Sequence, residues 1–120
     1  MKICVTARGN NLEAEVDQRF GRCDYFIVVD PETLEFRAIQ NPNAVAAGGA
    51  GIQSAQLIAL EKVEAVVTGN VGPNAYQTLS SLGIRICVGA SGLVKNAIEA
   101  FKQGNLSQAQ GSTTPKDSGK

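Results

Sequence analysis

The strongest constraint on the fold is a change of hydrophobic rhythm near residue 50. Before it, three short segments, 2–7, 24–30 and 35–40, have the apolar or alternating pattern of β-strands. After it, strand-like segments at 63–68 and 84–88 alternate with helical spacing at 52–62, 73–82 and 91–102. The predicted order, β-β-β-α-β-α-β-α, allows few topologies, because parallel neighbouring strands require right-handed crossovers.

These constraints predict an α/β fold of the ribonuclease-H-like type. We expect a mixed five-stranded sheet in the order 3-2-1-4-5 with three helices, in which hairpins join the first three strands. Residues 1–104 form a single domain in this interpretation. Residues 105–120 offer almost no apolar side chains to bury, so we predict a disordered C-terminal tail.

Composition excludes several classes of function. The chain has no histidine, which removes Ser-His-Asp and Cys-His catalysis and the zinc motifs that need imidazole. Lys plus Arg equals Asp plus Glu at 11 each, and aromatic residues make up 5%, so the sequence gives no sign of a nucleic-acid surface. No apolar run approaches the roughly 20 residues of a membrane span. We therefore expect a cytoplasmic protein that binds neither nucleic acid nor membrane.

The three cysteines are too widely spaced for a disulfide framework or a four-thiolate zinc site. Cys4 and Cys87 lie inside apolar strands, where a thiol behaves as a small buried hydrophobe. Cys23 stands at the start of a strand beside Arg22. A thiol near arginines and helix N-termini has a lowered pKa and can act as a metal ligand or a nucleophile. Burial as a structural residue is the alternative for Cys23.

Three glycine-rich segments, 47–51, 68–73 and 89–92, each precede a predicted helix. The topology brings them to the carboxyl ends of the parallel strands, the edge at which open α/β sheets bind ligands. Three helix N-termini at one crevice favour an anion. Arg8, Arg19 and Arg22 map to the same edge. Turns also require glycine without binding anything, so a purely structural role stays open for each loop.

Four motifs resemble a known family. They are Arg19-Phe20-Gly21-Arg22 before Tyr25-Phe26, Asn41-Pro42 followed by Gly48-Gly49-Ala50-Gly51-Ile52-Gln53, Gly69-x-x-Gly72 before a helix, and Gly83-Ile84 before the last strand. In this order, over residues 1–104, they resemble the dinitrogenase iron–molybdenum cofactor-binding family.

The resemblance implies a small non-enzymatic protein that binds or carries an iron–sulfur or iron–molybdenum–sulfur cluster, related to the assembly factors of nitrogenase cofactor biosynthesis. Its partner would be a protein that donates or accepts the cluster, and the chain itself would be a monomer or a weak dimer. Some family members use a histidine ligand, which this sequence lacks, so the expected metal ligand becomes Cys23. The predicted cofactor-binding residues are Arg19, Arg22, Gly48, Gly49, Gly51, Gly69 and Gly72.

Two other functions stay open. A metal-free module could bind a phosphate-bearing metabolite or a protein partner at the same glycine-rich edge, which would agree with the shortage of metal ligands. An enzyme would need Asp17 or Asp24, with a raised pKa, in place of the missing histidine base. We therefore expect no catalytic activity.

Overall fold

The sheet is built around β1 (Ile3–Ala7), every residue of which is buried. In the computed structural model, which describes residues 1–44 and 48–113, β1 pairs antiparallel with β2 (Tyr25–Val29) and parallel with β4 (Ala65–Val67). β3 (Phe36–Gln40) extends the sheet beyond β2, and β5 (Arg85–Val88) extends it beyond β4. The predicted order of the first five strands, 3-2-1-4-5, is confirmed.

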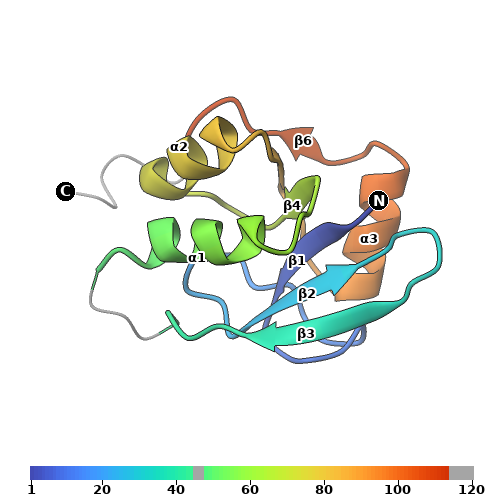
Figure 1. Cartoon of the computed structure of the whole chain (residues 1–120). Coiled ribbons are helices and arrows are strands. Elements are labelled where there is room, and N and C mark those ends of the chain that lie inside the picture. Colours follow the sequence, from blue (N-terminus) through green and yellow to red (C-terminus); the bar gives the residue numbers. More distant parts are fainter. Residues whose placement is uncertain (45–47, 114–120) are drawn as a thin grey trace.

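Helices cover both faces of this sheet (Figure 1). α1 (Ala50–Ala59) and α2 (Pro73–Ser81) pack side by side on one face, and α3 (Val94–Lys102) covers the other. The two faces follow from the alternation of side chains along each strand. Cys4 and Val66 point toward α1 and α2, whereas Val5 and Val67 point toward α3.

The C-terminal part of the chain corrects two predictions. Ser107–Gln108 form a short strand, β6, which pairs antiparallel with β5, so the described residues form a six-stranded sheet rather than a five-stranded one. The chain then reaches Val71, where the Thr113 N–H donates to the Val71 carbonyl at 2.8 Å and the Thr113 hydroxyl accepts from the Val71 N–H at 2.8 Å. Residues 105–113 are therefore ordered on the domain by backbone pairing, which hydrophobic patterning does not reveal. The rest of the predicted tail, residues 114–120, lies outside the described residues.

The helices of the described chain are short. None of them is long and apolar enough to span a bilayer.

Candidate functional site

The long loop between β1 and β2 crosses the carboxyl ends of the parallel strands. The loop forms two backbone hydrogen bonds with Asn70, which follows β4. The Asn70 N–H donates to the Gln18 carbonyl at 2.8 Å, and the Phe20 N–H donates to the Asn70 carbonyl at 3.3 Å. The Val16 N–H donates to the Gly92 carbonyl at 2.8 Å. Part of the edge that we predicted to be an open crevice is therefore filled by residues 16–20.

The N-terminus of α3 is occupied by the same loop. The Val94 N–H donates to the Ala14 carbonyl at 2.8 Å, and the Lys95 N–H donates to the Leu12 carbonyl at 3.0 Å. These carbonyls take the amide groups that a helix N-terminus would otherwise offer to a ligand. The prediction of three helix N-termini at one crevice is therefore wrong, because α3 lies on the other face and its end is satisfied within the protein.

The N-termini of α1 and α2 do share a cavity. Its volume is about 260 Å³. Four of the predicted residues line it, Arg22, Gly49, Gly51 and Gly72. The other five lining residues, which were not among the predicted cofactor-binding residues, are Phe20, Ala50, Pro73, Asn74 and Ala75.

Both helix ends are suited to an anion. Neither α1 nor α2 has a side-chain cap or an acidic residue in its first turn. The first turn of a helix leaves its N–H groups without intrahelical partners and carries partial positive charge. Pro73, the first residue of α2, has no N–H, so the donors of this helix end come from Asn74 and Ala75.

Two glycines allow the close packing around the cavity. A methyl group at Gly51 would lie 3.2 Å from the Ala75 Cβ, so the absence of a side chain at Gly51 lets α1 and α2 approach each other. Gly21 has a φ of +100°, and a methyl group there would lie 3.1 Å from the Gly51 Cα. Glycine is required at Gly21 both by its backbone conformation and by the contact.

Buried side chains hold the turn that carries Phe20 and Arg22. The Asn41 Nδ2 donates to the Gly21 carbonyl at 3.0 Å and to the Cys23 carbonyl at 2.9 Å. The Ser54 hydroxyl donates to the Gly21 carbonyl at 3.2 Å. Asn41 and Ser54 are both buried, so they fix the turn from beneath the cavity wall.

The two predicted arginines have different surroundings. Arg22 is half-buried and lines the cavity. Arg19 instead pairs with the buried carboxylate of Asp17, with its Nε 3.2 Å from Oδ1, and 62% of its side chain is exposed. The hydrogen bond to Asp17 raises the pKa of the Arg19 guanidinium. Arg19 therefore braces the loop, since its Nη2 also donates to the Arg22 carbonyl at 3.3 Å, and it does not line the cavity.

The environment of Cys23 differs from the predicted one. Its side chain is completely buried, and it is absent from the cavity lining. Burial, together with the negative charge of Asp17, raises the pKa of the Cys23 thiol to about 12. The expected lowering of this pKa is therefore wrong, because desolvation by burial outweighs the backbone hydrogen bonds that lower it. Cys4 and Cys87 are buried as predicted.

The remaining glycines do not line the cavity. Gly69 is buried beneath the loop, and a methyl group on it would lie 2.8 Å from the Gln18 Cα, so glycine there permits the loop to cross the strand end. Gly48 is exposed, and Ala47, at the start of the predicted segment, lies outside the described residues. Within residues 1–44 and 48–113, no three Cys, Asp or Glu side chains converge in a way that could hold a metal ion.

Comparison with known proteins decides the family. The family model described as "Dinitrogenase iron-molybdenum cofactor" matches residues 1–104. The chain belongs to this family.

Several similar proteins match this chain over nearly its whole length. The apo form of the orange protein from Desulfovibrio gigas is 37% identical, covers 94% of this chain and 96% of its own, and superposes with a TM-score of 0.89. A Thermotoga protein solved as a candidate NifB protein is 31% identical, with a TM-score of 0.82 and coverage of 96% and 97%. An uncharacterized protein of Methanocaldococcus jannaschii is 33% identical over 109 residues, which are 88% of this chain and 89% of its own.

The cavity brings together residues that lie far apart in the sequence. The segment 19–22 supplies Phe20 and Arg22, and Gly49, Gly51 and Gly72 form the two helix ends. Asn41 belongs to the same set because it holds the turn, a role that its place before Pro42 does not reveal. Asn74 has a simple signal in the sequence, since it directly follows the proline that opens α2.

Proposed function

We propose that this protein binds an anionic metal–sulfur cluster, of iron–sulfur or iron–molybdenum–sulfur type, in the cavity between the N-termini of α1 and α2. The cluster is cargo in this proposal, and the protein is a carrier rather than an enzyme. The observation that carries the proposal is the shared cavity, which combines two uncapped helix ends with Arg22 and Phe20.

The chemistry of the lining fits such a cargo. Sulfides of a cluster accept hydrogen bonds, and backbone N–H groups near them stabilise the negative charge. The first turns of α1 and α2 supply these donors, and Arg22 adds a full positive charge. The Phe20 ring packs at 5.7 Å from Phe26, so it presents a rigid apolar wall that excludes water from one side.

This arrangement supports binding through charge and hydrogen bonds in place of a protein thiolate. The Cys23 thiol is protonated at neutral pH because its pKa is about 12, and Cys23 is buried and not among the residues that line the cavity. Coordination by Cys23 is a second mode of the same proposal. It requires the turn at 21–23 to open and the thiol to lose a proton, which metal binding promotes.

A carrier must also exchange its cargo with a donor or acceptor protein. Gly49, Pro73 and Asn74 are exposed at the rim of the cavity, so a partner can reach the cluster without unfolding the domain. Binding through weak individual contacts is suited to such a transfer, because no metal–protein bond has to break.

Anaerobic titration with tetrathiomolybdate, a preformed molybdenum–sulfur dianion, tests the proposal, alongside reconstitution with iron and sulfide. We expect visible absorption that stays with the protein through gel filtration. Arg22→Gln should weaken binding by about tenfold, the usual value of one charge-assisted hydrogen bond. Arg8→Gln, which removes an exposed arginine outside the cavity, is the matched control.

Cys23→Ser separates the two modes. Unchanged absorption supports binding by the helix ends, and loss of absorption from a variant that remains folded supports thiolate coordination. Absence of retained metal and sulfide in the wild-type protein would overturn the proposal in both modes.

The shortage of metal ligands among the residues that the structure describes favours one alternative, a metal-free module for a phosphate-bearing metabolite. Two helix N-termini beside an arginine also suit a phosphate group. Thermal stabilisation by nucleotides or sugar phosphates, together with no uptake of metal and sulfide, would favour this alternative.

A further inference from the structure

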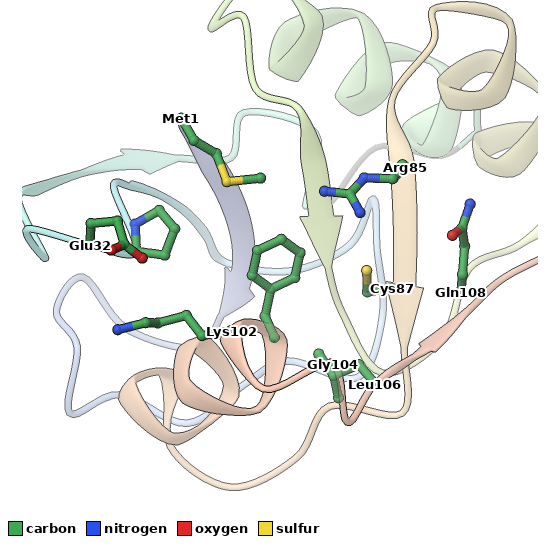
Figure 2. Close-up of a pocket in the computed structure, with 10 residues that line it drawn as sticks. Met1, Glu32, Arg85, Cys87, Lys102, Gly104, Leu106 and Gln108 are labelled. Atoms are coloured by element: carbon green, nitrogen blue, oxygen red, sulfur yellow. The ribbon is translucent and has the colours of Figure 1, made fainter.

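A larger cavity lies at the other end of the molecule, away from the helix N-termini (Figure 2). Its volume is about 400 Å³, within the range of small-molecule pockets. It lies on the α3 side of β5 and β6, near the start of β1. Arg85, the first residue of β5, and Phe101, in the last turn of α3, contribute to its walls.

Arg85 is a charged group held in place without an anionic partner. Its guanidinium carbon lies 5.7 Å from the centroid of the Phe101 ring, a cation–π contact. In the part of the chain that the structure describes, the ion pairs involve Arg19, Arg37 and Lys95, and none involves Arg85. The guanidinium therefore lies against the ring, and no ion pair among the described residues competes with a ligand for its N–H donors.

The cavity has a polar gradient from one side to the other. Figure 2 shows Lys102 and Glu32 on the side of the cavity opposite Arg85. On that side the positive charge of Lys102 is offset by the Glu32 carboxylate and by the C-terminus of α3, whereas Glu32 is the only acidic residue among the described residues of the lining and none lies beside Arg85. The negative group of a ligand therefore belongs beside Arg85.

The remaining walls are apolar. Met1, Phe101 and Leu106 supply hydrocarbon and thioether surface. Cys87 lies beneath Arg85, and burial raises the pKa of its thiol, so it adds a neutral wall without a competing negative charge. A small inorganic anion would not contact this apolar surface, so the lining favours a ligand that also has an apolar part.

We propose that this cavity is a second binding site, separate from the helix N-termini, for a small organic anion that combines a carboxylate with an apolar body. The carboxylate accepts hydrogen bonds from the Arg85 guanidinium, in the two-pronged geometry that arginine favours. The apolar body lies against Phe101, Leu106 and Met1. Arg85 sets the preference for the anion, and the apolar walls set the preference for its body.

Titration of the isotopically labelled full-length chain with sodium benzoate, followed by amide chemical shifts, tests the proposal. We expect saturable shifts at Cys87, Phe101 and Leu106, with a Kd on the order of 1–10 mM, the range open to a fragment of this size. Benzamide, which has the same shape without the charge, should bind at least about tenfold more weakly. Inorganic phosphate, which lacks the apolar body, should also bind more weakly than benzoate.

Variants assign the effect to Arg85. Arg85→Gln should weaken benzoate binding by about tenfold, whereas Arg8→Gln, with the same change of charge elsewhere, should leave it unchanged. Arg85 is exposed, so its replacement is expected to keep the fold, which the amide spectrum itself reports. Equal binding of benzoate and benzamide, unchanged binding in Arg85→Gln, shifts confined to other parts of the chain, or no saturable shift would each overturn the proposal. So would phosphate binding as tight as that of benzoate.

Discussion

Asn41 is the side chain on which the turn at residues 21–23 most depends. It is 5% exposed, and its amide donates to the carbonyls of both Gly21 and Cys23. The Gly21 carbonyl has a second donor in Ser54, whereas no other hydrogen bond to the Cys23 carbonyl is formed within the described residues. Asn41→Ala therefore leaves one buried acceptor unpaired and another with a single partner.

The cost follows from this accounting. An unsatisfied buried carbonyl costs about 1–3 kcal/mol, and the weakened one adds to it, so we expect Asn41→Ala to lower the free energy of unfolding by about 2–3 kcal/mol. Ser54→Ala removes one of two donors to Gly21 and should cost about 1 kcal/mol. The double variant leaves Gly21 with neither donor. Its loss should exceed the sum of the single losses by about 1 kcal/mol.

Urea unfolding followed by far-ultraviolet circular dichroism measures all four proteins in this cycle. With a slope of roughly 2 kcal/mol/M, Asn41→Ala should shift the midpoint by about 1 M. Asn41→Asp keeps the size of the side chain but places a carboxylate against two carbonyls, so at neutral pH it should be at least as destabilising as alanine. Additive losses, or a loss below about 0.5 kcal/mol for Asn41→Ala, would show that this side chain does not hold the turn.

Three further results are expected. Gly69→Ala should destabilise the fold by about 2 kcal/mol or more and speed hydrogen exchange near Gln18, because its methyl group would meet that residue's backbone; unchanged exchange would contradict this role. Burial raises the pKa of Cys23 to about 12, so the folded state favours the neutral thiol. The resulting contribution to the free energy of unfolding is complete below the unfolded-state pKa of about 9 and is lost as the pH rises toward 12. The stability difference between wild type and Cys23→Ala should therefore fall by about 1.4 kcal/mol per pH unit above pH ~9, and a pH-independent difference would refute the burial argument. Thr113→Val removes the acceptor of the Val71 N–H and should cost about 1 kcal/mol, with faster exchange of that amide; protection equal to wild type would contradict it.

Hydrophobic rhythm predicted the sheet because the rhythm reports burial. Val5 of β1 and Ile27 of β2 are paired across the two strands, and both are buried. The first five strands lie in the predicted order. β6 escaped prediction because Ser107 and Gln108 are exposed and join the sheet through backbone bonds alone. Such pairing leaves no trace in the spacing of apolar residues.

The candidate site was predicted in part for the same reason. Gly49, Gly51 and Gly72 precede or begin helices, and topology alone brings those helix ends together. The direction of a side chain is a different matter. Arg19 turns to Asp17, and Cys23 turns into the core, because a buried carboxylate and a packed loop lie there. The spacing of residues in the sequence does not show which way either side chain turns.

The contact between Gly51 and Ala75 gives the cavity an adjustable width. The gap between the two helix ends is set by the side-chain volume at this contact, and both residues line the cavity. Each added methyl group there would move the two sets of amide donors apart by a few tenths of an ångström. The size of the cargo that the proposed site accepts would therefore depend on how closely α1 packs against α2.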